Sequence, residues 1–172
     1  MTRVGVGIDV HPFATDGRPL MLCGTEIPGE VGLDGHSDGD VGLHALADAM
    51  LGAAALGDLG ERFGTDRPEN EGADSRGFLT DVHTAISAMG FDIVNVDVTI
   101  VAQQPQLSPH RRNMRLAIAG ILRLAEDSVS VKFTTTDRIG SIGRGEGIAA
   151  WAVCSVEEVG ITSALSRMPG LT

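Results

Sequence analysis

The sequence predicts an α+β fold: one domain, residues 1–172, with a mixed β-sheet covered by helices on one face. The chain has 172 residues, 42% of them hydrophobic and 21% charged, which is enough for one buried core. No repeat, low-complexity block or linker divides it. Segments with strand alternation are interleaved with helical segments, about five strands and three helices. Because three helices cover only one sheet face, we expect self-association to bury the other.

The first half of the chain predicts two strands and a long helix. Residues 3–9 alternate branched apolar side chains with small or polar ones, and a proline follows, which is typical of a strand. A second strand is expected over residues 20–27. A glycine-rich loop then leads to Ser37, which begins the capping-box pattern Ser37-x-x-Asp40. We therefore expect a helix from this point to about Leu56.

The second half predicts two further helices and three strands. Residues 74–89 form a helix that ends at a glycine. Residues 91–103 form a long strand, and four of its apolar side chains are expected on one face: Val94, Val96, Val98 and Ile100. Ser108 and the proline after it begin the third helix. The last two strands are expected over residues 129–135 and 148–157.

Composition excludes several classes of partner. The formal net charge is -10, which repels nucleic acid and anionic membranes, and an aromatic content of 3% with no tyrosine leaves little for base stacking. Asp9 interrupts the first apolar stretch, and the longest apolar run, residues 148–154, is too short to cross a membrane. Cys23 and Cys154 are far apart, which indicates reduced thiols. We expect a cytoplasmic protein with no nucleic-acid or membrane partner.

The segment GIDVHPF places a carboxylate and an imidazole two residues apart, at Asp9 and His11. Residues i and i+2 of a strand share a face, and their Cα atoms are about 6.6 Å apart, so both side chains can reach one metal ion. A turn cap beside a surface histidine is the alternative. The segment alone offers only half of a metal site, so further ligands elsewhere in the chain are needed to decide between the two.

A second polar cluster begins the first predicted helix. Four acidic or histidine residues fall within nine positions beside several glycines: His36, Asp38, Asp40 and His44. With Asp48, the last two form a stripe of four-residue spacing along the helix, which could also be only a solvated face. A calcium loop is excluded, because Ala45 stands where the bidentate glutamate should be. Imidazoles favour zinc instead.

A third cluster is VKFTTTDRIGSIGRGEG, residues 131–147, which follows a predicted strand. Threonine hydroxyls and free backbone N–H groups suit phosphate oxygens, Asp137 could hold a divalent cation, and Arg144 could pair with a phosphate. A threonine-rich strand ending in a glycine turn is the alternative. Walker and Rossmann spacings are absent. Lys132, the single lysine, offers a compact ammonium group.

Five segments, in this order, resemble the 2-C-methyl-D-erythritol 2,4-cyclodiphosphate synthase family: GIDVHPF, HSDGDVGLHALADAMLGAAALGDLG, GADSRGF, NVDVTIVAQQPQLSPH and VKFTTTDRIGSIGRGEGIAA. The resemblance covers about residues 3–158. It implies a homotrimer with active sites between subunits. It also implies a phosphorus–oxygen lyase of non-mevalonate isoprenoid biosynthesis, which cyclises 4-diphosphocytidyl-2-C-methyl-D-erythritol 2-phosphate and releases CMP.

The resemblance also implies the site residues. Asp9, His11 and His44 would bind zinc, and Asp137, where glutamate is usual, a second cation, Mg²⁺ or Mn²⁺. His36 and Thr135 would stabilise the transition state. The nucleotide diphosphate substrate would contact Asp9, Val10, His11, His36, Ser37, Asp58, Leu59, Gly60, Phe63, Gly64, Thr65, Asp66, Arg67, Ala102, Gln103, Gln104, Pro105, Gln106, Leu107, Ser108, Thr134, Thr135, Thr136, Asp137, Ser141 and Arg144.

Two departures from the family pattern stand out. The loop FGTDRPEN, residues 63–70, replaces the usual F-P-x-x-D-P, and Ser141 replaces a common phenylalanine that helps line a central apolar cavity in some relatives. Two other functions fit the same residues: a zinc-dependent phosphohydrolase that uses metal-bound water, and a nucleotide-binding regulatory trimer without turnover.

Overall fold

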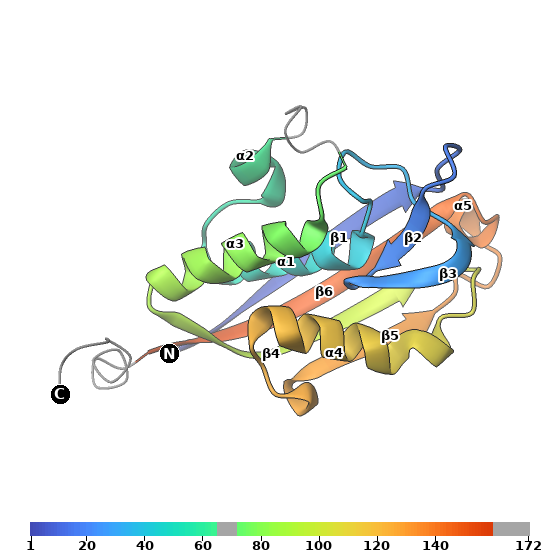
Figure 1. Ribbon diagram of the computed structural model, residues 1–172. Helices are drawn as coiled ribbons and strands as arrows, with labels where there is room; N and C mark the ends of the chain where they lie inside the picture. Colours follow the sequence, from blue (N-terminus) through green and yellow to red (C-terminus); the bar gives the residue numbers. More distant parts are fainter. Residues whose placement is uncertain (65–71, 160–172) are drawn as a thin grey trace.

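A four-stranded mixed sheet forms the centre of the protein, in a computed structural model that describes residues 1–64 and 72–159 (Figure 1). The strand order is β1 (Thr2–Pro12), β6 (Gly147–Glu158), β4 (Phe91–Val101) and β5 (Val129–Thr134). β6 is antiparallel to both of its neighbours, whereas β4 and β5 are parallel. The predicted mixed sheet is confirmed, and all four strands fall in segments that the sequence predicts as strands.

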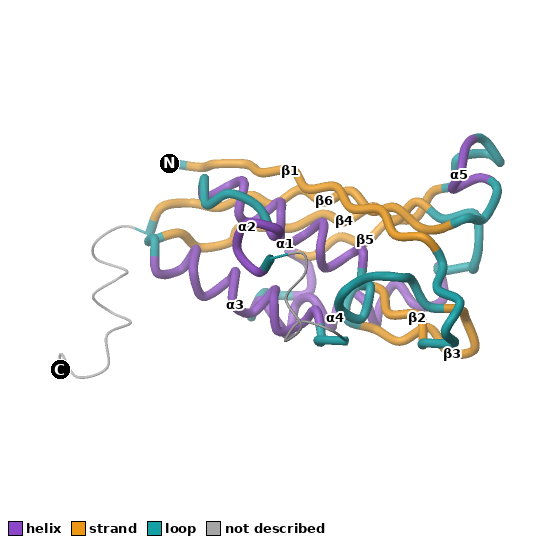
Figure 2. The backbone as a smooth tube through the Cα atoms, turned by 90° about the horizontal axis from the view of Figure 1, so that it is seen from above, coloured by secondary structure: helices purple, strands orange, loops and turns teal. Residues whose placement is uncertain are grey.

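Three long helices lie against one face of this sheet, as predicted (Figure 2). They are α1 (Val41–Ala54), α3 (Ser75–Ala88) and α4 (Arg111–Leu122). A 3₁₀ turn over Ser108–His110 leads into α4, and another, Glu126–Ser128, precedes β5. The described residues also contain two short helices, α2 (Leu59–Phe63) and α5 (Gly140–Gly143). No helix in the described ranges is long and apolar enough to cross a membrane.

The single strand predicted over residues 20–27 is wrong. This segment is a hairpin of β2 (Pro19–Leu22) and β3 (Thr25–Val31), which form a separate two-stranded sheet. The turn residues Cys23 and Gly24 have φ values of 52° and 73°. Their backbone amides donate to the buried carboxylate of Asp40, at 2.7 and 2.6 Å. A distant carboxylate therefore stabilises a left-handed turn at a cysteine, which is a residue type that does not favour it.

The first helix has a different N-cap from the one predicted. It is Asp40, not Ser37, that caps α1, because its side chain accepts the backbone N–H of Leu43 at 3.0 Å. Nearly all of α1 is buried between the sheet and α3. A Cβ atom at Gly5 or Gly7 would lie 2.0 Å from a carbonyl oxygen of α1. These glycines of β1 therefore permit the close approach of the strand to the helix.

Val94 does not share a face of β4 with the other three predicted side chains, because the register of this strand shifts. Val96, Val98 and Ile100 are buried as predicted, but Val94 is 43% exposed. The pairing of β4 with β6 shifts between Ile93 and Asn95, which is the signature of a β-bulge. The bulge reverses which side chains point inward, so Ile93 is buried in place of Val94.

The sheet face opposite the helices is rich in exposed apolar side chains. On β1 every second residue from Val4 to Val10 points away from the helices and is 51–62% exposed: Val4, Val6, Ile8 and Val10. Trp151 and Val153 continue this surface onto β6, where they pair with Ile8 and Val6. Lys132 lies on the same face and forms an ion pair with Asp97 at 2.6 Å. We call this surface the open sheet face.

Candidate active site

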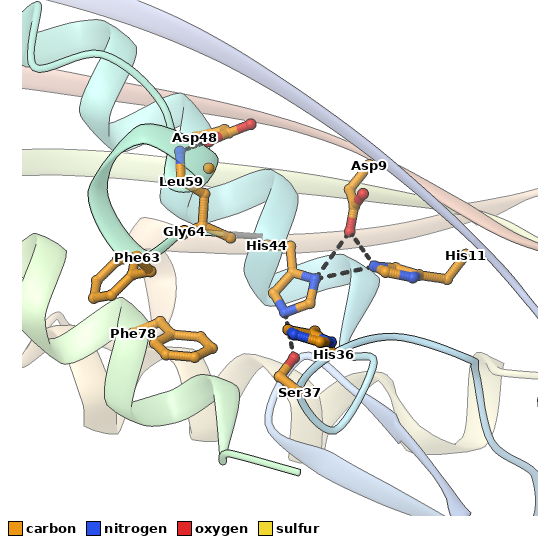
Figure 3. A pocket seen from close by; sticks show the side chains of 11 residues that line it. Asp9, His11, His36, Ser37, His44, Asp48, Leu59, Phe63, Gly64 and Phe78 are labelled. Atoms are coloured by element: carbon orange, nitrogen blue, oxygen red, sulfur yellow. Dashed lines mark hydrogen bonds and ion pairs between the residues drawn. The ribbon is translucent and has the colours of Figure 1, made fainter. Parts of the chain in front are cut away.

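The two predicted halves of a metal site come together beside β1 and α1 (Figure 3). Asp9 and His11 lie near the end of β1, and His44 lies on α1. The Oδ2 atom of Asp9 is 2.8 Å from Nε2 of His11 and 3.0 Å from Nδ1 of His44, and the two imidazole nitrogens are 3.2 Å apart. Within the described ranges this is the one group of three or more acidic, histidine or cysteine side chains that could hold a metal ion.

The geometry of this cluster fits a small tetrahedral cation. Bonds of about 2.0–2.1 Å to zinc place neighbouring ligand atoms about 3.3 Å apart, close to the observed separations. Nδ1 of His11 lies 2.6 Å from the carbonyl oxygen of Asp34. Since a carbonyl oxygen only accepts, Nδ1 of His11 carries the proton and Nε2 is free to bind metal. Two imidazoles and one carboxylate form a donor set typical of zinc.

The cluster shifts the pKa values of its own members in the absence of metal. Burial alone would raise the pKa of Asp9, but hydrogen bonds and charges from His11 and His44 outweigh it and hold that pKa well below 3.8. Burial alone would lower the pKa of His11, but the Asp9 carboxylate raises it above 6.5. A metal ion that binds here must therefore displace a proton that the carboxylate stabilises.

The cluster opens into a cavity of about 280 Å³. At one end are the metal-site residues with His36 and Ser37. At the other end the walls are apolar, where the rings of Phe63 and Phe78 lie 4.8 Å apart. Figure 3 shows these two ends facing each other across the cavity, with Asp48 and Leu59 along one side.

Asp48 and Asp58 hold the short helix α2 against this cavity. Asp48 accepts the backbone N–H of Leu59, the first residue of α2, at 2.7 Å. Asp58 caps the same helix by accepting the N–H of Glu61 at 2.7 Å. Burial raises the pKa of Asp48, and the nearby Asp58 adds to that rise. Because Asp48 is one helical turn beyond His44, α2 is tied directly to the helix that carries a metal-site residue.

A second cavity, of about 350 Å³, gathers another predicted set. Its lining consists of Phe133 and nine residues that the family resemblance assigns to substrate: Ala102, Gln103, Gln104, Pro105, Gln106, Leu107, Ser108, Thr134 and Thr135. That they bind a nucleotide stays a prediction. Of the residues described, none lines both this cavity and the one beside the metal cluster.

The predicted phosphate loop lies exposed between β5 and β6. The hydroxyl of Thr135 donates to Asp137 at 3.2 Å, and Asp137 has a φ of 51°. Arg144 forms an ion pair with Glu146 at 2.6 Å, which a phosphate would have to replace. Ser141 is exposed on α5. The role of Asp137 in binding a second cation is not tested by these contacts.

The remaining predicted contacts differ in position. Val10 is not among the residues that line the first cavity: its side chain lies on the open sheet face, and its backbone N–H donates to Asp9 at 2.9 Å. Thr65, Asp66 and Arg67 lie outside the described residues. Sequence reasoning missed Ser75, whose hydroxyl lies 2.9 Å from His44 although 31 residues separate them. It lies in the segment GADSRGF, for which the family resemblance implied no role of this serine.

Comparison with known proteins decides the family. The family model described as the YgbB family matches residues 2–157. The chain belongs to this family. A Laribacter hongkongensis protein is 51% identical over 155 residues, which are 90% of this chain and 95% of the relative; one from Pasteurella multocida is 52% identical over 156 residues, 91% and 98%. Both are named 2-C-methyl-D-erythritol 2,4-cyclodiphosphate synthase, so the predicted family resemblance is confirmed.

Solved structures of the same kind share the fold. Bifunctional IspDF from Campylobacter jejuni aligns with a TM-score of 0.90 and 39% identity over 94% of this chain. This chain spans 44% of that protein. IspF of Plasmodium falciparum, described as a CDP complex, aligns with a TM-score of 0.80 and 32% identity over 92% of this chain and 97% of its own.

Proposed function

We propose that this YgbB-family chain is a 2-C-methyl-D-erythritol 2,4-cyclodiphosphate synthase. It converts 4-diphosphocytidyl-2-C-methyl-D-erythritol 2-phosphate to the cyclic diphosphate and releases CMP. The observation that carries the proposal is the Asp9, His11 and His44 cluster at the polar end of a cavity whose other end is apolar. A phosphorylated polyol with a methyl group matches both ends of this cavity.

The reaction exchanges one phosphorus–oxygen bond for another. An oxygen of the 2-phosphate forms a bond to the distal phosphorus of the diphosphate. The bond from that phosphorus to the bridging oxygen breaks, and its electron pair leaves with CMP. Such phosphoryl transfers depend mostly on positioning and on stabilising negative charge, so no covalent enzyme intermediate is required. A zinc ion held by the three-residue cluster would supply Lewis-acid stabilisation of phosphoryl charge.

The other residues hold the two ends of the substrate. His36 and Ser37 border the metal cluster and would donate to phosphate oxygens. The start of α2, residues 58–60, would hold the polyol, and Phe63 would contact its apolar part. The second cavity, residues 102–108, would hold the cytosine. This division keeps the reacting phosphates between the two ends.

The nucleotide diphosphate requires its own charge compensation, because the chain has a net charge of -10. Thr134, Thr135 and Thr136 offer hydroxyls, and Asp137 would hold a Mg²⁺ or Mn²⁺ ion that neutralises the diphosphate. Here the carboxylate is one methylene shorter than the glutamate of the family pattern. Arg144 would give up its ion pair with Glu146 and bind a phosphate oxygen instead.

A homotrimer is part of the proposal. The open sheet face exposes six large apolar side chains, which a second copy of the chain would bury. Because no residue in the described ranges lines both cavities, a substrate that fills both is best accommodated between neighbouring subunits. The active site would then be complete only in the assembly.

A product assay tests the proposed function. The purified protein is incubated with substrate, zinc and magnesium, and the products are followed by ³¹P NMR. A synthase yields CMP and a cyclic diphosphate in equal amounts. Inorganic phosphate would instead indicate a phosphohydrolase, and unchanged substrate in the presence of measured binding would indicate a regulatory protein; either result would refute the proposal.

A further inference from the structure

The imidazole of His44 is held on the side away from the metal cluster by two buried hydroxyls. Its Nε2 atom lies 2.9 Å from Oγ of Ser75 and 3.0 Å from Oγ of Ser37. Ser75 is 1% exposed and Ser37 is 4% exposed. Each hydroxyl could in principle donate to Nε2 or accept from it, so the protonation of His44 depends on where the two hydroxyl protons point.

The direction of the Ser75 hydroxyl follows from its third partner. Oγ of Ser75 lies 2.5 Å from Oδ1 of Asp38, and a carboxylate only accepts hydrogen bonds. The same carboxylate also accepts the backbone N–H groups of Ser75 and Asp40, both at 3.2 Å. The single proton of the Ser75 hydroxyl is thus donated to Asp38. Toward His44, Ser75 can only accept.

We infer that Asp38 and Ser75 are positioning residues that favour the tautomer of His44 protonated on Nε2, with the Nδ1 lone pair directed at the metal site. A neutral imidazole has one proton. Ser75 draws this proton to Nε2, whereas the Asp9 carboxylate, 3.0 Å from Nδ1, draws it to Nδ1 until a metal ion binds there. Nδ1 is the atom that faces Asp9 and His11. The inference rests on the metal-binding part of the proposed function.

The chain of contacts also joins two helices to the site. Asp38 lies in the loop before α1, and its backbone N–H donates to the carbonyl of Ala73 at 3.0 Å. Ser75 is the first residue of α3 and His44 lies in α1. Both histidines of the metal cluster are thus oriented by a hydrogen bond from outside it. Ser75 orients His44, and the carbonyl oxygen of Asp34 orients His11. Such outer contacts typically change metal affinity by about 10–100-fold.

Removal of the Ser75 hydroxyl isolates this effect. In Ser75→Ala, Nε2 of His44 retains only Ser37, whose hydroxyl can donate or accept, so the preference for a proton on Nε2 is lost. We expect the dissociation constant for zinc, measured by chelator competition, to rise about 10–100-fold. Ser87→Ala is the matched control, because Ser87 is exposed near the other end of the same helix and should leave zinc affinity unchanged.

Nitrogen NMR of the histidine rings reads the tautomer directly. In the metal-free wild-type protein a fraction of His44 should be protonated on Nε2, because Ser75 competes with Asp9 for the ring proton. In Ser75→Ala this fraction should fall. This readout needs no substrate and no turnover, so it remains informative if the chain does not catalyse the proposed cyclisation.

Two results would each overturn the inference: an equal fraction of Nε2-protonated His44 in wild type and Ser75→Ala, or a Ser75→Ala protein that folds and binds zinc within about twofold of wild type. If Ser75→Ala does not fold, Asp38→Ala replaces it. This change removes the acceptor that holds the proton of the Ser75 hydroxyl, which is then free to turn toward His44. It should weaken zinc binding to a similar extent, and unchanged affinity would refute the relay.

Discussion

Replacement of Asp48 tests how the cavity wall is held. Asp48 accepts the N–H of Leu59 at 2.7 Å and is the side chain that joins α1 to the start of α2. In Asp48→Ala this N–H loses its acceptor, while Asp58 still caps the helix. We expect α2 to lie less often in its substrate-binding position. Zinc content should not change, because Asp48 is not one of the three clustered ligands.

The size of the effect follows from the type of bond. A hydrogen bond to a charged acceptor contributes about 1.5–3 kcal/mol, and the lower end applies because the Leu59 amide is only partly buried. A loss of about 1.5 kcal/mol corresponds to about a tenfold change in an equilibrium constant. If α2 contacts substrate equally in the ground and transition states, this loss raises KM about tenfold and leaves kcat unchanged.

Steady-state kinetics and amide hydrogen exchange measure the two halves of this argument. The KM of Asp48→Ala should rise about tenfold, and the Leu59 amide should exchange faster than in wild type. Asp48→Asn is the control, since its side-chain oxygen can still accept the same N–H, and its KM should change far less. An unchanged KM in Asp48→Ala, or a fall in kcat alone, would refute a positioning role for Asp48.

Four further predictions address the metals, the pH dependence and the assembly. His44→Ala should lose zinc and turnover but remain folded, and full zinc occupancy by metal analysis would remove His44 from the ligand set. Asp137→Asn should keep zinc but require much more magnesium for activity; superimposable magnesium titrations would contradict its assignment to the second cation. The pKa of His11 is raised above 6.5 in the folded metal-free protein, because the protonated ring pairs with Asp9. This ion pair stabilises the fold fully below pH 6.5, and the stabilisation is lost as the pH rises through the raised pKa. Thermal melting in a chelator should therefore give a higher Tm near pH 6 than near pH 8, and Asp9→Asn should flatten this difference; equal profiles for both proteins would contradict the ion pair. Light scattering should report about three times 17.9 kDa for wild type, and Val6→Asp should lower this mass by placing a charge on the open sheet face; a wild-type monomer would refute the trimer.

Periodicity and short motifs determined much of the fold from the sequence alone. The alternation in residues 3–9 identified the strand that becomes β1, since a strand directs alternate side chains to opposite faces. The glycine after residue 89 marked the end of α3. The spacing of Asp9 and His11 placed both on one face of a strand, which is why half of the metal cluster was visible locally.

Only the tertiary structure decided features that depend on distant partners. The turn at Cys23 needs the carboxylate of Asp40, and the burial of Ile93 in place of Val94 needs a bulge against β6. Ser75 gains its place beside His44 because α3 packs on α1, so no pattern near either residue could indicate the contact. Local propensity fixes the period of an element, whereas a hydrogen bond across 31 residues depends on how the elements pack against each other.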